Sequence, residues 1–189
     1  MVLGNKFRRA QILLGNKIDA EGSIQEREMI RVDRFLNQAL DIKLIEAIGR
    51  GFAEAFSDRQ VDKILTVEAS GIALAFATAQ AMKINAIFAK KGTPHNVTGA
   101  VLECQVYSYT RQNFYPLSLS KSLIQPGDRI LLVDDFLARG QAMQGLIRIV
   151  RQAEAEVVGV AVAIEKSFQG GSTMIRDEGY EVVSLRNYS

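Results

Sequence analysis

Apolar residues along this chain recur with two different spacings, and each spacing predicts a different kind of element. Between residues 41 and 56 they recur every three or four positions, which predicts an amphipathic helix with Asp41 as its N-cap. A rougher stripe near the start predicts an N-terminal helix that ends near Gly22, followed by an extended piece over 28–32. The residues on these two stripes are Phe7, Ile12, Leu13 and Ile18, then Leu44, Ile45, Ile48, Phe52 and Phe56.

The rest of the chain alternates short apolar runs with helical patterns. Near-continuous apolar runs are typical of strands that are buried on both faces of a parallel sheet. Segments of helical length lie between them, so we predict an α/β fold with an open, mostly parallel sheet flanked by helices. The predicted strands are 63–67, 85–89, 129–135, 156–164 and 180–185, and the predicted helices are 72–82, 141–153 and 173–179.

Residues 100–120 break this alternation. The segment AVLECQVYSYTRQNFYPLSLS mixes β-branched, aromatic and polar residues, which is typical of an antiparallel arm or a mobile flap. No linker or repeat divides the chain, and 189 residues suit one ordinary α/β domain. We therefore expect a single domain over residues 1–189.

Composition and charge narrow the class of protein. The chain is 48% hydrophobic and 23% charged, and its net charge of +2 is spread without a basic stripe, so no nucleic-acid partner is expected. One cysteine, Cys104, and one histidine, His95, exclude an internal disulfide and the usual zinc sites. Because no apolar run has the length of a signal peptide or a membrane span, we expect a cytoplasmic location without a membrane partner.

The stretch ILLVDDFLARGQA, residues 130–142, carries the candidate chemistry. It places Asp134 and Asp135 at the end of a buried strand, directly before a loop of small residues that opens a helix. Backbone N–H groups at a helix N-terminus bind phosphate, and carboxylates bind hydroxyl groups, so the pattern suits a ribose 5-phosphate. The alternative is an acidic pair that merely ends a strand beside solvent and a helix N-terminus. A Walker A loop and a dinucleotide-binding fingerprint are both absent from the sequence.

This stretch resembles the phosphoribosyl-pyrophosphate signature of type I phosphoribosyltransferases. The segments RVDRFLNQALD, TVEASGIA, VYSYTRQ and AIEKSFQGG narrow the resemblance to the bacterial members of that family that act on xanthine. The resemblance implies the type I phosphoribosyltransferase fold, with a small N-terminal hood over residues 1–40 and an antiparallel flap. It also implies transfer of a 5-phosphoribosyl group from phosphoribosyl pyrophosphate to xanthine, which gives xanthosine 5′-monophosphate and pyrophosphate in purine salvage.

The resemblance assigns the residues that bind the phosphoribosyl donor. Asp134 and Asp135 would be the catalytic pair that binds the ribose hydroxyls. Lys90 and Lys91 would reach pyrophosphate, across a dimer interface, although a solvated pair of loop lysines explains them equally well. The 5-phosphate would be surrounded by Ala138, Arg139, Gly140, Gln141 and Ala142, and pyrophosphate by Glu68, Ala69, Ser70 and Gly71.

For the base, the resemblance points to the hood and to the end of a later strand. Lys166 would donate to the 6-oxo group of the purine, and Asn37, beside Ile30, would pair with its 2-oxo edge. Phe136 would pack against the purine, with Phe168 as a second candidate. Without the resemblance, Lys166 reads as a solvated lysine, Asn37 as a cap or turn residue, and either aromatic residue as part of the core.

Two further expectations and two alternatives accompany this assignment. Mg²⁺ is the implied cofactor, bound through pyrophosphate with Asp134 and Asp135 as candidate ligands, and a homodimer is the implied assembly. Hypoxanthine-guanine enzymes of this family carry an aspartate where this chain has Ala138, so no general base is assigned there. The alternatives are a non-catalytic regulator that senses the donor and binds nucleic acid, and the same kind of enzyme acting on hypoxanthine, guanine or adenine.

Overall fold

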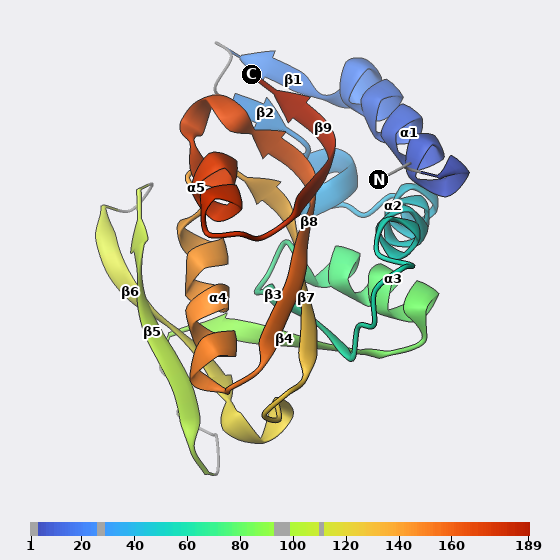
Figure 1. Cartoon of the computed structure of the whole chain (residues 1–189). Helices are drawn as coiled ribbons and strands as arrows, with labels where there is room; N and C mark the ends of the chain where they lie inside the picture. The colour runs from blue at the N-terminus through green and yellow to red at the C-terminus, as the bar shows by residue number, and fades with distance from the viewer. Residues whose placement is uncertain (1–3, 26–28, 93–98, 110–111) are drawn as a thin grey trace.

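The central feature of the computed structural model, which describes residues 4–25, 29–92, 99–109 and 112–189, is a seven-stranded sheet (Figure 1). The strand order is β5-β6-β4-β3-β7-β8-β9. The five strands from β4 to β9 along this order run parallel, whereas β6 pairs antiparallel with both β4 and β5. The predicted open, mostly parallel sheet is therefore confirmed. The strands are β3 (Lys63–Val67), β4 (Asn85–Lys91), β5 (Val101–Ser108), β6 (Asn113–Ser120), β7 (Arg129–Leu137), β8 (Glu156–Lys166) and β9 (Val182–Tyr188).

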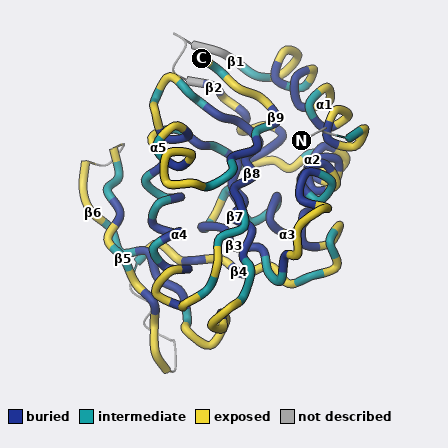
Figure 2. Tube along the Cα trace, in the orientation of Figure 1, coloured by how far each residue is buried: buried dark blue, intermediate teal, exposed yellow. Residues whose placement is uncertain are grey.

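Helices cover both faces of the sheet, and this explains the near-continuous apolar runs. On β7, Leu131 and Val133 join one core cluster with residues of α1, α2 and α3, whereas Ile130 and Leu132 join a second cluster with residues of α4 and α5. The central strands are accordingly buried along most of their length (Figure 2). The helices are α1 (Asn5–Glu21), α2 (Ile42–Ala55), α3 (Ile72–Met82), α4 (Gln141–Gln152) and α5 (Gly171–Asp177).

The segment between β4 and β7 forms the predicted antiparallel arm. Strands β5 and β6 pair from Val101↔Ser120 to Ser108↔Asn113, and the hairpin projects beside α4 (Figure 1). A glycine in α4 permits this approach, because a Cβ atom at Gly145 would lie 2.6 Å from Cγ2 of Val106.

The N-terminal region lies over the carboxyl ends of β8 and β9 (Figure 1). Strands β1 (Ser23–Gln25) and β2 (Met29–Arg31) form a small antiparallel sheet, and a π-helical turn, η1 (Asp33–Asn37), follows. Ile30, Phe35 and Leu36 are buried in the same core cluster as α1 and α2, so this segment is packed onto the core. None of the described helices is long and apolar enough to cross a membrane.

Two sequence predictions about the helices have different outcomes. Asp41 is the N-cap of α2, since its Oδ1 accepts a hydrogen bond from the Leu44 backbone N–H at 3.1 Å. The predicted apolar stripe of α1 is wrong at Ile12 and Leu13, which are 62% and 37% exposed. The buried face follows the 3.6-residue period through small residues instead, and those two side chains fall outside it. The buried residues of α1 are Phe7, Ala10, Leu14, Gly15 and Ile18.

Helices α2 and α3 approach so closely that one glycine is required between them. A Cβ atom at Gly49 would lie 2.4 Å from the carbonyl carbon of Ala77, which is backbone and cannot rotate away. We expect Gly49→Ala to lower the free energy of unfolding by about 1–3 kcal/mol, because the two helices must separate. Urea unfolding measures the effect.

Gly15→Ala is the matched control in a neighbouring helix. A Cβ atom there would meet only the Nη1 atom of Arg186, at 3.7 Å. The added methyl group should raise the free energy of unfolding by about 0.5–1 kcal/mol through helix propensity alone. Equal destabilisation by both substitutions would contradict the close approach of α2 and α3.

Candidate active site

The candidate site lies where the order of strands reverses. After β3 the chain passes through α3 on one face of the sheet to β4, and after β7 it passes through α4 on the other face to β8. Because β3 and β7 are neighbours, the connections leaving their carboxyl ends go to opposite faces of the sheet, and ligands of open α/β sheets bind at such a point. Residues 68–71 follow β3, and the acidic pair with the loop after it ends β7, so the sheet brings together two segments of the predicted site.

The acidic pair joins these two segments directly. Asp134 and Asp135 are only 6% and 5% exposed at the end of β7. The Asp135 backbone N–H donates to Oδ1 of Asp134 at 2.9 Å, and the Ser70 hydroxyl donates to Oδ1 of Asp135 at 3.0 Å. The carboxylates are therefore held by the protein backbone and by the 68–71 turn.

The environment of Asp134 changes its acidity. Burial raises the pKa of Asp134 well above its ordinary value, and the nearby charge of Asp135 raises it further. The folded protein thus holds a proton on this carboxyl at a pH at which an exposed aspartate has lost it. A ligand that supplies hydrogen-bond donors or positive charge would favour the ionised form.

The turn of residues 68–71 is shaped by a glycine and by a buried threonine. A Cβ atom at Gly71 would lie 2.1 Å from Oγ1 of Thr66 and 2.6 Å from Oδ1 of Asp134, so only glycine fits. The Glu68 carboxylate accepts a hydrogen bond from the Lys91 backbone N–H at 2.8 Å, which ties the turn to β4. The peptide bond between Glu68 and Ala69 is cis. Thr66 was not singled out from the sequence, because a threonine inside an apolar strand carries no signal of its own.

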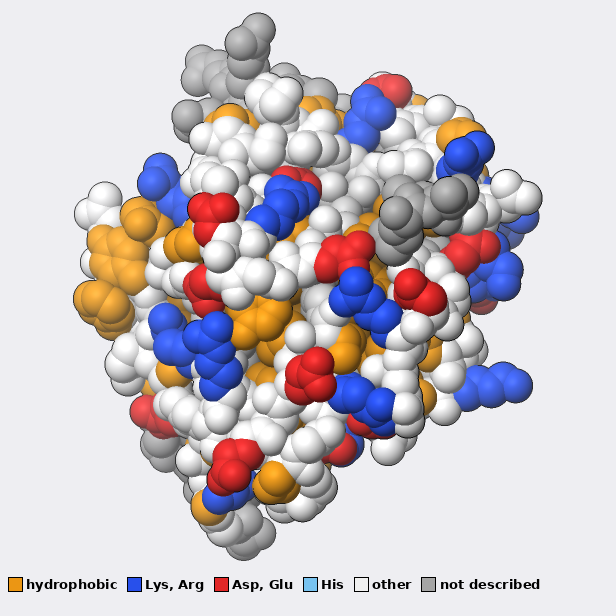
Figure 3. Space-filling view, in the orientation of Figure 1, with side chains coloured by type: hydrophobic (Ala, Val, Ile, Leu, Met, Phe, Trp, Pro, Cys, Tyr) orange, Lys and Arg blue, Asp and Glu red, His pale blue; other side chains and the backbone are white. Residues whose placement is uncertain are grey.

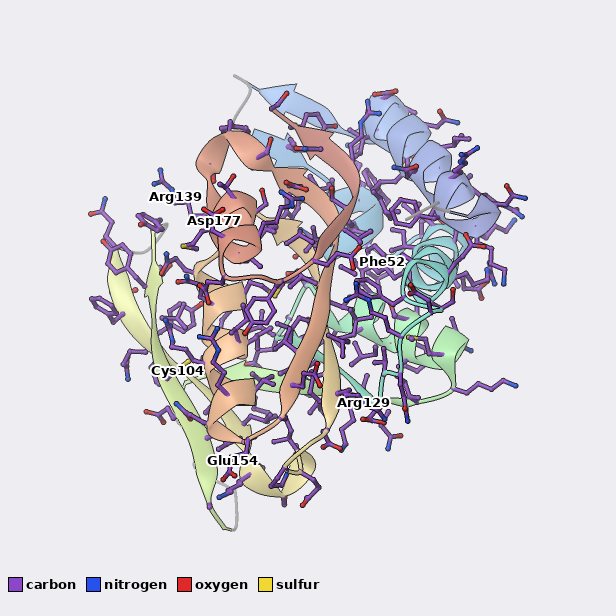
Figure 4. The ribbon with its side chains drawn as sticks, in the orientation of Figure 1. Phe52, Cys104, Arg129, Arg139, Glu154 and Asp177 are labelled. Atoms are coloured by element: carbon purple, nitrogen blue, oxygen red, sulfur yellow. The ribbon has the colours of Figure 1, made fainter. Side chains whose placement is uncertain are left out.

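The loop after the acidic pair, residues 138–142, is hereafter the cradle loop. Strand β7 continues to Leu137, two residues beyond the predicted end of the strand, and α4 begins at Gln141, so the irregular part is only three residues long. Gly140 has φ +78° and directly precedes α4, whose first N–H groups therefore face the loop. The Arg139 guanidinium stacks on the ring of Tyr109, 4.3 Å from its centroid, and points toward the β5–β6 hairpin (Figure 4).

Gly171, at the start of α5, packs directly against the backbone of the cradle loop. Its backbone N–H donates to the Ala138 carbonyl at 3.1 Å. A Cβ atom at Gly171 would lie 2.3 Å from that carbonyl oxygen and 2.5 Å from the Gly140 nitrogen. Sequence reasoning missed this residue, and the only available signal was the Gly-Gly pair that follows Gln169.

A pocket of about 490 Å³ lies between the cradle loop and the β5–β6 hairpin. Asp134, Phe136 and Lys166 line it together with the whole cradle loop, and Lys166 Nζ lies 5.3 Å from the Phe136 ring centroid. On the hairpin side the lining residues are Tyr107, Tyr109 and Tyr115. Hydrophobic side chains gather at this end of the hairpin on the molecular surface (Figure 3).

The other predicted site residues lie outside this pocket. Lys90 is exposed on β4, and Phe168 is 44% exposed after β8. Ile30 is buried in the hood, in the core cluster against which Phe136 packs. Asn37 is half-buried, and its Oδ1 atom is buried without a hydrogen-bond donor in the described part of the chain. His95 lies outside the described residues.

A larger hollow, of about 740 Å³, lies beside α2 and α3, away from the carboxyl ends of the strands. Both of its carboxylates and two of its cations already have partners, since Arg59 pairs with Glu181. Glu54 accepts a hydrogen bond from the Phe7 backbone N–H at 2.9 Å, and Arg50 pairs with Glu46 at 3.4 Å. These contacts are structural, so the smaller pocket is the candidate site.

The raised pKa of Asp134 predicts how stability changes with pH. Folding takes up a proton between the ordinary value of 3.8 and the raised folded-state value, so the free energy of unfolding falls as the pH rises through that window. Asp134→Asn removes the titrating group and keeps an oxygen that accepts from the Asp135 N–H. We expect the variant to be more stable than the parent protein at about pH 8, with the difference vanishing below about pH 4.

Urea unfolding across this pH range measures the effect, and Asp62→Asn is the control with the opposite sign. The hydrogen bond from Arg129 lowers the pKa of Asp62, so its contribution is present at neutral pH and is lost in acid. An Asp134→Asn variant that is less stable than the parent protein at high pH would contradict the assignment.

Comparison with known proteins identifies the family. The phosphoribosyl transferase domain family matches residues 36–185. Xanthine phosphoribosyltransferase of Laribacter hongkongensis is 46% identical over 173 residues, which cover 91% of each protein. Xanthine phosphoribosyltransferase of Streptococcus equi subsp. zooepidemicus is 44% identical over 173 residues, which cover 92% of this chain and 90% of the relative.

Solved structures agree on the fold. Adenine phosphoribosyltransferase from Rhodothermus marinus superposes with a TM-score of 0.74 at 21% identity and covers 95% of this chain and 98% of its own. The enzyme from Giardia lamblia, complexed with 9-deazaadenine, gives a TM-score of 0.76 at 16% identity over 92% of this chain and 97% of its own. On its family match and on the identity of these relatives, the chain belongs to the phosphoribosyltransferase family.

Proposed function

We propose that this protein transfers the 5-phosphoribosyl group of phosphoribosyl pyrophosphate to xanthine, giving xanthosine 5′-monophosphate and pyrophosphate. The proposal depends on one observation: the buried acidic pair, which precedes the cradle loop, contacts the turn of residues 68–71 where the order of strands reverses. The chain is also 44–46% identical to proteins named xanthine phosphoribosyltransferase. In the reaction, the bond between ribose C1 and a pyrophosphate oxygen breaks and a bond from a ring nitrogen of xanthine to C1 forms. Xanthine arrives ionised or loses its proton to water.

The donor is held at both of its ends and at the ribose. The backbone N–H groups of the cradle loop and of the first turn of α4 bind the 5-phosphate. Asp134 and Asp135 accept hydrogen bonds from the ribose hydroxyls. Ser70, which already donates to Asp135, joins this position to the turn that binds pyrophosphate. Fixing three points of the donor holds C1 in place while its bonding changes.

The base occupies the space beside Phe136 and Lys166, under the hood of residues 1–40. The Lys166 ammonium lies over the Phe136 ring and donates to the 6-oxo group. The buried Oδ1 atom of Asn37, which lacks a donor in the described structure, supports a role for Asn37 against the purine edge. A site that must pair a polar group of its substrate rejects analogues that lack the matching group.

The residues at the acidic pair fit Mg²⁺ that arrives with the donor. No group of three or more His, Cys, Asp or Glu side chains comes together within the described residues, so the protein supplies at most the two carboxylates here. Mg²⁺ is commonly bound by one or two carboxylates together with phosphate oxygens. When bound, the ion neutralises charge on the departing pyrophosphate. Asp134 and Asp135 would hold it, and the 68–71 turn would orient the pyrophosphate.

The assembly that we propose is a homodimer through the α3–β4 side of the molecule. Phe76 on α3 is 63% exposed and Phe88 on β4 is 40% exposed. Ile87 and Ala89 point into the core cluster of α4, so Phe88 lies on the same face of the sheet as α3. Two exposed phenylalanines on one face suit a second copy of the chain, and Lys90 at the end of β4 would then lie near the partner's site.

The assignment of the base is tested by assaying xanthine, hypoxanthine, guanine and adenine in parallel with Mg²⁺ and the donor. We expect kcat/KM to be at least about tenfold higher for xanthine than for each other base. Asp135→Asn should lower it by about tenfold or more through lost hydrogen bonds, and EDTA should abolish turnover. The exposed Asp58→Asn variant is the control and should match the parent enzyme.

The outcomes of this assay separate the alternatives. Preference for another base would overturn the xanthine assignment and leave the donor site standing. Donor binding without reaction of any base would favour the regulator that senses the donor.

The assembly is tested by the oligomeric state of Phe76→Glu in sedimentation. We expect the parent protein to be a dimer and this variant a monomer, because a charge would be buried at the interface. Ile12→Glu alters a side chain of similar exposure on α1 and should remain dimeric. A monomeric parent protein at micromolar concentration would rule out the proposed interface.

A further inference from the structure

A buried carboxylate lies next to the candidate site without belonging to it. Glu165, near the end of β8, is only 1% exposed. Arg176 of α5 binds it in a fork, with Nη1 at 2.9 Å from Oε1 and Nη2 at 3.1 Å from Oε2, and the Ser184 hydroxyl donates to Oε2 at 2.7 Å. Burial alone would raise the pKa of Glu165, but the hydrogen bonds from Arg176 and Ser184 contribute to lowering it below its ordinary value. The ion pair is therefore fully formed at neutral pH.

Glu165 lies close in the structure to both the cradle loop and the pocket residue Lys166. In the β7–β8 register it lies opposite Leu137, the residue directly before the cradle loop. It also directly precedes Lys166, which lines the pocket. The Arg176 Nη2 atom additionally donates to the Val182 carbonyl of β9 at 3.3 Å. One arginine thus ties α5 to the two strands at this edge of the sheet.

The same short helix carries the glycine that supports the cradle loop. Gly171 begins α5, donates to the Ala138 carbonyl and packs directly on the loop backbone, whereas Arg176 lies near the other end of the helix. The clearance at Gly171 is too small for even one methyl group. A shift of α5 by a fraction of an ångström would therefore move the cradle loop or open a gap behind it.

We propose that Arg176 is a positioning residue for the 5-phosphate: its fork on Glu165 fixes α5, and α5 fixes the cradle loop through Gly171. This inference rests on the proposed role of the cradle loop as the 5-phosphate site. Arg176 touches no substrate and acts only through the loop. Its effect falls on the 5-phosphate end of the donor, because the pyrophosphate turn is carried by β3 and is held by Ser70 and Glu68.

The test is calorimetric binding of ribose 5-phosphate and, separately, of pyrophosphate with Mg²⁺ to the Arg176→Gln variant. We expect the Kd for ribose 5-phosphate to rise about tenfold, the loss of roughly one well-placed hydrogen bond to a charged group. The Kd for pyrophosphate should change less than twofold. Arg176→Lys keeps the charge without the fork and should give an intermediate Kd.

Arg129→Gln is the matched control. Arg129 also makes a bidentate contact with a carboxylate, since its Nε and Nη2 atoms each lie 3.0 Å from an oxygen of Asp62. It sits at the opposite end of β7 from Arg139 (Figure 4). We expect this variant to lose thermal stability and to bind ribose 5-phosphate as the parent protein does. All binding is measured well below the melting temperature of each variant.

Each outcome decides the inference. If Arg176→Gln binds ribose 5-phosphate as the parent does, or if Arg129→Gln weakens binding equally, Arg176 is only structural and the proposal is wrong. If Arg176→Gln does not fold, Arg176→Lys decides in the same way. If the parent protein does not bind ribose 5-phosphate, the proposed role of the cradle loop fails, and this inference fails with it.

Discussion

Two adjacent parallel strands, β3 and β7, end beside one another, and the helices that follow them cover opposite faces of the sheet. This constraint brings the turn of residues 68–71 against the acidic pair at the end of β7. Ser70 and Asp135, 65 positions apart in the sequence, are joined there by a hydrogen bond. The same arrangement buries the acidic pair, because strands covered on both faces leave little solvent at the sheet edge. A functional group is thus held at some cost to stability, which the raised pKa of Asp134 expresses.

At two places in this site a glycine allows two backbone segments to pack closely against each other. Gly71 is pressed against Thr66 and Asp134, and Gly171 is pressed against the cradle loop. In both places the absence of a side chain lets one segment rest on another, so that backbone groups are fixed by packing. A phosphate bound by backbone N–H groups needs such fixed geometry, because the groups carry only partial charges. The contact with Gly171 at the start of α5 helps to fix the backbone of the cradle loop in this way.

Two segments outside the parallel sheet lie toward the carboxyl ends of its strands, the hood and the β5–β6 hairpin (Figure 1). The hood packs its apolar residues into the core, and the buried Oδ1 atom of Asn37 has no hydrogen-bond donor among the residues that the structure describes. The β5–β6 hairpin reaches the cradle loop through the stacking of Arg139 on Tyr109. Three tyrosines of the hairpin, Tyr107, Tyr109 and Tyr115, line the pocket beside the cradle loop.

The sequence by itself determined the elements and the chemistry of single segments. Runs apolar on both faces identified the parallel strands, the spacing from Asp41 to Phe56 identified α2, and residues 134–142 identified the acidic pair and cradle loop. It did not determine which residues of α1 are buried, because more than one set of apolar and small residues fits a helical period. It also did not determine the length of the cradle loop, because the sequence does not mark where β7 ends. The tertiary structure decided that Ser70 meets Asp135, that Gly171 supports the cradle loop, and that Arg176 grips Glu165. Those contacts depend on strand order and on clearances of a few tenths of an ångström, neither of which leaves a pattern along the chain.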